Sequence, residues 1–134
     1  MKPFISSPVL HGDKQGRKIS YPTINLDPTT WPADHEPGVY AAEVSIGEPP
    51  TAFQGALYYG PRTIQGETNN VLEIFLLNFS QEVYGQTASF RLHKFIRPVL
   101  HFKTFVELKA EIARDVLAVS NAFDTGETET LDES

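Results

Sequence analysis

The chain has 134 residues, 40% of them hydrophobic, which is enough for one domain with a buried core and no structural metal. It has no cysteine, so disulfides, thiolate metal sites and cysteine nucleophiles are excluded. The formal net charge of −6 is concentrated in residues 124–134, because the remaining 12 acidic and 11 basic residues nearly balance. A near-neutral body argues against a general nucleic-acid binder, which needs a basic face.

The N-terminal stretch MKPFISSPVLHGDK is interrupted by Pro3 and Pro8 and does not resemble a signal peptide. No run approaches the roughly 20 apolar residues of a membrane span. We therefore expect a cytoplasmic protein without a membrane partner. Residues 124–134 are expected to form an acidic, disordered tail that aids solubility, which leaves residues 1–123 as the folded domain.

Short apolar segments separated by turn residues predict several strands. After a possible strand start at residues 23–26 and a proline-rich loop, four segments have the composition or alternation of strands: 39–46, 52–60, 71–79 and 87–96. The last element is a helix. Thr104 as N-cap with Glu107 three residues later forms a capping box, and an apolar stripe recurs at helical spacing: Phe105, Leu108, Ile112 and Val116. This order predicts a closed antiparallel barrel with one helix packed against it.

Thr23 and Asn25 are the first candidate site residues. In a strand they lie on one face, and each offers an oxygen ligand of the kind that Mg²⁺ prefers when it is shared with substrate phosphates. The alternative is a solvated polar turn, because Tyr-Pro-Thr is common turn chemistry.

The preceding segment HGDKQGRK combines glycines with cations. Gly12 and Gly16 allow backbone N–H groups to close on an anion, and Arg17 and Lys18 add positive charge. The segment does not match the P-loop pattern, so the signal is weak by itself.

Glu73 stands within the otherwise apolar run VLEIFLLNF. A carboxylate in a buried strand is costly unless it is paired or functional, and burial would raise its proton affinity, as suits a general base near neutral pH. The alternative is an exposed position on an edge strand. The four histidines have no paired metal spacing, and no serine lies in a G-x-S-x-G context, so neither a transition-metal site nor a serine hydrolase is supported.

Taken in order, these motifs resemble riboflavin kinases over residues 8–118. The most specific piece is the Pro-Thr-x-Asn signature at residues 22–25. The glutamate-centred strand followed by Tyr84-Gly85, and Arg97-Pro98 followed by Phe102, support it. The resemblance implies a six-stranded barrel with a C-terminal helix. It also implies transfer of a phosphoryl group from ATP to riboflavin to give FMN, by a stand-alone kinase domain. Only about ten residues precede the barrel, so the nucleotidyltransferase domain that many bacterial relatives carry there is not expected.

The resemblance also implies roles for individual residues. Thr23 and Asn25 would bind Mg²⁺ with ATP, and Glu73 would be the base that activates the riboflavin 5′-hydroxyl. Arg97 and Phe102 would lie near the flavin. The remaining expected nucleotide contacts are Gly12, Gly16, Arg17, Lys18 and Tyr84. Small-molecule substrates and a monomer are expected, with no nucleic acid.

Two alternatives remain open at this stage. Ser20 stands where the family usually has glycine, and the loop at residues 60–64 departs from the family pattern. These departures motivate a flavin- or nucleotide-binding module with little kinase activity. An unrelated barrel that binds proteins or oligonucleotides is the third possibility.

Overall fold

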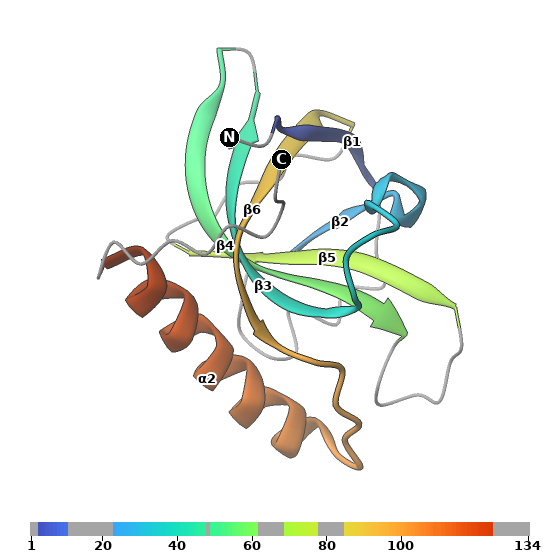
Figure 1. Cartoon of the computed structure of the whole chain (residues 1–134), viewed down its shortest axis with the longest axis vertical. Helices are drawn as coiled ribbons and strands as arrows, with labels where there is room; N and C mark the ends of the chain where they lie inside the picture. The colour runs from blue at the N-terminus through green and yellow to red at the C-terminus, as the bar shows by residue number, and fades with distance from the viewer. Residues whose placement is uncertain (1–2, 11–22, 48, 62–68, 78–84, 125–134) are drawn as a thin grey trace.

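The computed structural model describes residues 3–10, 23–47, 49–61, 69–77 and 85–124. Its strands are β1 (Ile5–Leu10), β2 (Thr23–Leu26), β3 (Gly38–Ile46), β4 (Thr51–Pro61), β5 (Asn70–Leu76) and β6 (Thr87–Arg97). They pair antiparallel in the order β1-β2-β5-β4-β3-β6 and close into a barrel (Figure 1). A 3-10 helix, η1 (Pro28–Thr30), follows β2, and the long helix α2 (Phe105–Asp124) follows β6. The predicted closed six-stranded barrel with a C-terminal helix is confirmed.

The interior of the barrel is filled by the inward-facing residue of each alternating pair, as the two-residue period of a strand requires. Leu57, Ile74 and Phe90 are fully buried there, together with Leu26 and Leu72. The residues between them point outward, and these outer positions carry Thr23 and Asn25 of β2 and Glu73 of β5. The hydrophobic alternation of the sequence therefore separates a packed interior from an outer face that is available for chemistry.

The proline-rich segment between β2 and β3 closes one end of the barrel. Trp31 is 8% exposed and stacks on Tyr59 with ring centroids 4.7 Å apart, and its indole N–H donates to the carbonyl of His35 at 3.0 Å. Tyr40 meets the same indole edge-to-face at 5.3 Å. The sequence indicated only a loop in this segment, because packing against a distant strand leaves no local periodicity.

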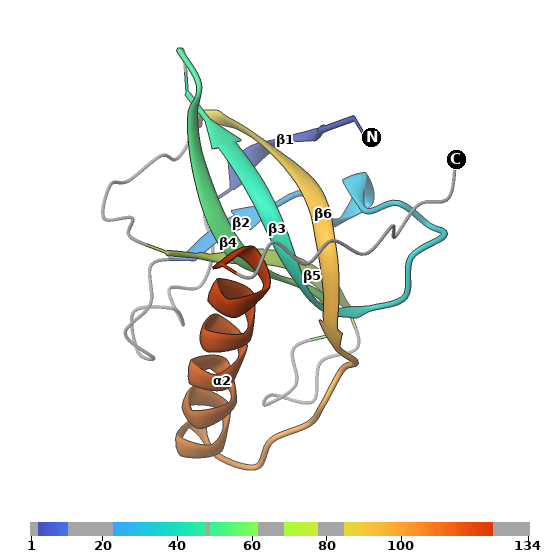
Figure 2. The same cartoon turned by 60° about the vertical axis from the view of Figure 1, so that its left-hand side comes forward.

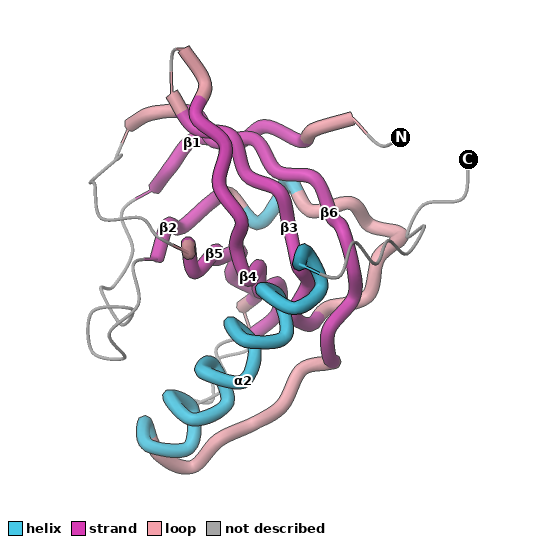
Figure 3. The backbone as a smooth tube through the Cα atoms, turned by 90° about the vertical axis from the view of Figure 1, so that its left-hand side faces the viewer, coloured by secondary structure: helices cyan, strands magenta, loops and turns pink. Residues whose placement is uncertain are grey.

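Helix α2 covers part of the barrel exterior, with its C-terminal half against β3 and β4 and its N-terminal end extending beyond the strands (Figures 2 and 3). Its buried positions are Ile112, Asp115, Val119 and Ala122. The predicted stripe is therefore only partly correct, since Phe105 is 37% exposed. The first turns extend past the barrel and find less to pack against, which shifts the buried face. α2 is not long and apolar enough to cross a membrane, and the same holds for every helix in the described ranges.

The start of α2 follows the predicted capping box in part, because the Glu107 carboxylate bonds to the residue before the N-cap and not to the N-cap itself. The Glu107 backbone N–H donates to the Thr104 hydroxyl at 3.2 Å, and the Glu107 carboxylate accepts from the Lys103 backbone N–H at 2.9 Å. The helix ends at Asp124, the first residue assigned to the acidic tail. The rest of that tail lies outside the described residues, so its expected disorder stays a prediction.

Gly38 allows β3 to begin close against the end of β6. Its φ is 150°, and a Cβ there would collide with the Arg97 carbonyl oxygen and lie 3.0 Å from Phe95 Cε1 and 3.1 Å from Pro98 Cα. We expect Gly38→Ala to lower the free energy of unfolding by about 2–3 kcal/mol. Gly85→Ala is the control, because Gly85 has φ 82° with no neighbouring atom within 4 Å and should lose only about 1 kcal/mol. Equal losses in urea titrations would contradict the crowding at Gly38.

Candidate active site

The first part of the site lies on β2. Ile24 and Leu26 are buried in the barrel core, so the alternating residues Thr23 and Asn25 face outward and are half-buried. The expected strand at residues 23–26 is therefore confirmed, and the polar-turn alternative is wrong for these residues. A hydroxyl and an amide oxygen stand on one outer face, two residues apart.

One row of the barrel lines up residues that are far apart in the sequence. Asn25 on β2 is paired with Glu73 on β5, and Glu73 is paired with Tyr58 on β4. Tyr58 is opposite Val39 on β3, and Val39 is opposite Arg97 on β6. Directly opposed residues of antiparallel strands have Cβ atoms about 4.5–5.5 Å apart. The row thus brings three of the predicted site residues, Asn25, Glu73 and Arg97, onto one strip of the outer face.

Glu73 occupies a position with neighbours on both sides. Leu72 and Ile74 are fully buried in the core, which directs the Glu73 side chain to the outer face, where it is half-buried. Strand β5 is paired with β2 and with β4. The edge-strand alternative is therefore wrong, and the carboxylate stands between Asn25 and Tyr58.

Tyr58 is the member of the row that sequence reasoning missed. Its hydroxyl donates a hydrogen bond to the Pro61 carbonyl. Burial raises the pKa of Tyr58 to about 12; the positive charge of Arg97 opposes this shift and the negative charge of Glu73 adds to it. The phenol is therefore neutral at physiological pH, and the charges of Arg97 and Glu73 both act on it. The only sequence signal was a tyrosine at an outward position of a strand that ends in glycine and proline.

Arg97 connects the row to helix α2. Its Nε and Nη2 donate to the two carboxylate oxygens of Asp115, each at 2.8 Å, and Glu111 Oε2 lies 3.4 Å from Nε. A register shift between the Tyr40–Phe95 and Val39–Arg97 pairs marks a bulge that aims Arg97 outward.

Asp115 is deeply buried, with 5% of its side chain exposed. Burial raises its pKa, while the hydrogen bonds and charge of Arg97 act in the opposite direction. The Phe102 ring centroid lies 6.0 Å from the Arg97 guanidinium carbon. Arg97 and Phe102 are thus together, as the resemblance implied, and their proximity to a flavin stays a prediction. Asp115 and Glu111 were missed, although an aspartate on the apolar face of a helix was a usable signal.

Five predicted nucleotide contacts lie outside the described residues: Gly12, Gly16, Arg17, Lys18 and Tyr84. Their described neighbours are close to the row. Leu10 directly precedes residues 11–22, which include Gly12, Gly16, Arg17 and Lys18, and Leu10 is paired with Asn25. Thr23 directly follows the same residues. Gly85, directly after Tyr84, donates its backbone N–H to the Val9 carbonyl at 3.2 Å.

The oxygen donors that the site offers a divalent cation are a hydroxyl and an amide. Within the described ranges, no group of three His, Cys, Asp or Glu side chains converges so as to hold a metal ion. Thr23 and Asn25 fit a hard cation that keeps most of its ligands as water and phosphate oxygens. They do not form a complete cage, so substrate phosphates would have to supply further ligands.

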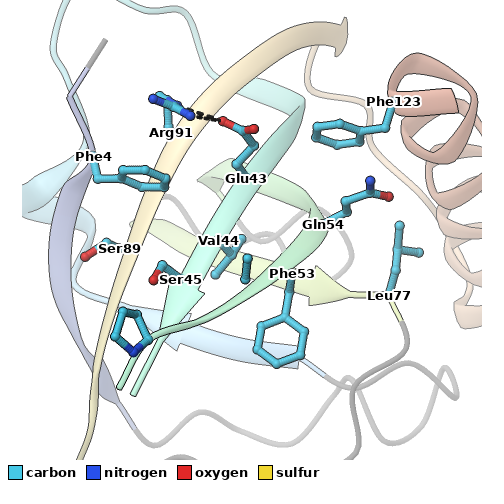
Figure 4. A pocket seen from close by; sticks show the side chains of 12 residues that line it. Phe4, Glu43, Val44, Ser45, Phe53, Gln54, Leu77, Ser89, Arg91 and Phe123 are labelled. Carbon is cyan, nitrogen blue, oxygen red and sulfur yellow. Dashed lines mark hydrogen bonds and ion pairs between the residues drawn. The ribbon is translucent and has the colours of Figure 1, made fainter. Parts of the chain in front are cut away.

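A separate open groove of about 980 Å³ lies on the outside of β3, β4 and β6, near the end of α2 (Figure 4). The Glu43–Arg91 ion pair, with Nη2 and Oε1 2.6 Å apart, lies within it, and Arg91 stands over the Phe4 ring at 4.6 Å. None of the predicted site residues lines the groove. The hollow surface and the polar row are therefore different regions of the barrel.

Comparison with known proteins assigns the chain to a class and then to a family. It is similar in fold to a solved structure titled as a macrolide-efflux protein from Streptococcus pneumoniae, with a TM-score of 0.72 and 24% identity over 88% of this chain and 38% of that one. This likeness shows the fold alone, a closed β-barrel protein with one flanking helix, here bearing a polar site on its outer face. The Flavokinase family model, described as riboflavin kinase, matches residues 1–123, so the chain belongs to the riboflavin kinase family.

Bacterial relatives agree with this assignment. The chain is 39% identical over 120 residues to the bifunctional riboflavin kinase/FMN adenylyltransferase of Escherichia coli K12, covering 89% of this chain and 37% of that protein. The enzyme of the same name from Haemophilus influenzae is 36% identical over 118 residues, covering 86% and 37%. The Bacillus subtilis counterpart is 35% identical over 116 residues, covering 84% and 36%. The chain therefore spans little more than a third of the length of these relatives.

Proposed function

We propose that this protein is a riboflavin kinase, which transfers the γ-phosphoryl group of ATP to the 5′-hydroxyl of riboflavin and releases FMN and ADP. Membership of the family and the position of Glu73 support this proposal. The observation that carries it is the pairing of Glu73 with Asn25 in register, because it puts a candidate base beside a candidate phosphate and cation site.

The chemistry follows from the two sides of Glu73. Its carboxylate accepts the proton of the riboflavin 5′-hydroxyl as that oxygen forms a bond to the γ-phosphorus. The bond between that phosphorus and the bridging oxygen breaks in line, and the electron pair leaves with ADP. Neighbouring residues of the row hold the two substrates in this alignment, which is the main requirement of phosphoryl transfer.

Riboflavin kinases generally use a divalent metal, and we infer that Thr23 and Asn25 hold Mg²⁺ here. When bound, the cation would offset negative charge on the ATP phosphates. The hydroxyl of Thr23 and the amide of Asn25 orient the nucleotide on the β2 side of Glu73. The predicted contacts of Gly12, Gly16, Arg17, Lys18 and Tyr84 with the nucleotide belong to this same side of the proposal.

Replacing Thr23 or Asn25 by alanine should raise the Mg²⁺ concentration needed for half-maximal activity by at least about 10-fold, because each change removes an oxygen donor. Thr23→Ser keeps the hydroxyl and should stay near wild type. Asn70→Ala is the matched amide control, because Asn70 is exposed at the start of β5 and bonds to the Tyr59 hydroxyl instead. An unchanged Mg²⁺ dependence in Asn25→Ala would count against the metal role.

The decisive test of the proposed function is a phosphotransfer assay with riboflavin, Mg²⁺ and a panel of nucleotides, in which FMN is separated from riboflavin by chromatography. FMN formed only in the complete mixture supports the kinase. Tight flavin binding without FMN would instead support the binding module that Ser20 and the loop at residues 60–64 motivate.

We also infer that the protein acts as a monomer in the cytoplasm, on small molecules and without nucleic acid. The near balance of charge outside residues 124–134 supports the absence of nucleic-acid binding, since it leaves no excess of cations to bind phosphate backbones. Light scattering after size exclusion measures the oligomeric state, and a filter-binding assay with single-stranded and duplex DNA tests the last point.

A further inference from the structure

The two sides of Glu73 are chemically different. On the β2 side the row continues to Asn25, an amide next to the Thr23 hydroxyl. On the β4 side it continues to Tyr58, an aromatic ring, and then over Val39 to the Arg97–Asp115 pair. A base that acts between two substrates needs each of them on a defined side. The chemical difference between the β2 side and the β4 side of Glu73 indicates which substrate lies on which side.

In-line transfer requires the attacking and leaving oxygens to lie on opposite sides of the phosphorus. If the nucleotide phosphates lie on the β2 side with Asn25, the acceptor must approach Glu73 from the β4 side. Arg97, near which the acceptor ring system is proposed to lie, is on the strand three spacings from that of Glu73, or about 14 Å along the sheet. The strand next to Glu73 in this direction carries Tyr58, so the chain that links the ring to the reacting hydroxyl would lie over Tyr58.

The Tyr58 side chain is held in one position by its neighbours. Its ring lies over Gly60, where a Cβ would come within 2.8 Å of the Tyr58 hydroxyl oxygen and 3.0 Å of Val99 Cγ2. Its O–H donates to the Pro61 carbonyl, so the phenol oxygen keeps a lone pair that can accept a hydrogen bond from a ligand. A half-buried aromatic face with one oriented acceptor suits a flexible polyhydroxylated chain.

From this geometry we propose that Tyr58 contacts the sugar-alcohol chain of the acceptor and selects for it. The inference rests on the proposed function. The tyrosine ring supports the carbon backbone of the chain, and its oxygen accepts a hydrogen bond from one of the chain's hydroxyl groups. Tyr58 is thus a specificity residue for the acceptor, while Glu73 handles the transferred proton.

Steady-state kinetics provide the first test. Tyr58→Phe should raise KM for riboflavin by about 3–10-fold, the usual effect of one neutral hydrogen bond, and Tyr58→Ala by more. KM for ATP should stay within about twofold in both variants, because the nucleotide is on the other side of Glu73. Tyr59→Phe is the matched control, since Tyr59 packs on Trp31 at the barrel end. An ATP KM that rises together with the riboflavin KM would indicate general distortion and overturn the proposal.

Binding without nucleotide separates this inference from the proposed function. Riboflavin and lumiflavin share the ring system, but lumiflavin has a methyl group in place of the sugar-alcohol chain. In fluorescence titrations, Tyr58→Phe and Tyr58→Ala should weaken riboflavin binding and leave lumiflavin binding unchanged. Equal weakening of both ligands, or of neither, overturns the contact with the chain. Wild-type protein that neither binds nor phosphorylates riboflavin would contradict the proposed function itself. If Tyr58→Ala does not fold, the Tyr58→Phe comparison still decides.

Discussion

Replacing Glu73 by glutamine is expected to lower kcat for FMN formation by about 10²-fold or more, which is within the usual range for the loss of a general base. The amide keeps the shape of the side chain and its place between Asn25 and Tyr58, but it cannot accept the proton of the attacking hydroxyl. The KM values for ATP and riboflavin should change little, because the contacts that hold the substrates remain. Single-turnover rapid-quench measurements isolate the chemical step.

The matched control is Glu43→Gln. Glu43 is also on the outer face of the barrel and pairs with Arg91 in the separate groove, away from the row. It should keep near-wild-type kcat. Turnover close to wild type in Glu73→Gln would refute the assignment of the base, and an equal loss in both variants would indicate a nonspecific effect of removing a surface charge.

The second large effect concerns stability. Asp115→Ala should lower the free energy of unfolding by about 3 kcal/mol and the melting temperature by about 10 °C. The change leaves the Arg97 side chain, which is 14% exposed, without the carboxylate that accepts its two hydrogen bonds. Glu111 remains 3.4 Å away and limits the loss. Differential scanning calorimetry and urea titration measure both quantities.

Arg114→Ala is the comparison for an exposed charge. Its side chain is 72% exposed and pairs with Glu111 within the helix, so its loss should cost no more than about 0.5 kcal/mol. The double variant Arg97→Met with Asp115→Leu should recover part of the stability, because neither charge is then buried alone. A double variant as unstable as the sum of its single variants would contradict this account of the pair.

Much of the fold could be predicted from local patterns. The alternation of apolar residues indicated β3, β4, β5 and β6, and most of the predicted strand ends lie within two residues of the observed ones. The capping box at Thr104 marked the start of the helix. The strand predicted over 71–79 is longer than β5, which ends at Leu76. The short β1 was not predicted as such, because a serine- and proline-containing stretch has little alternation to detect.

The chemistry of several candidate residues could also be read from the sequence. Thr23 and Asn25 are two residues apart, and in a strand this alone puts both on one face. Glu73 stood out because a carboxylate within an apolar run is costly to bury unless it is paired or functional. Local spacing specifies the face of a strand, but it does not say which residue of which other strand lies next to it.

The sequence by itself determined the size of one domain with a barrel pattern, a helix with a defined start, and a short set of polar residues on known faces. Only the tertiary structure decided that Asn25, Glu73, Tyr58 and Arg97 share one row, and that Asp115 pairs with Arg97. The physical reason is register. In a closed barrel, each strand is held by hydrogen bonds to two partners that can be distant in sequence, and closure leaves one consistent alignment for all of them.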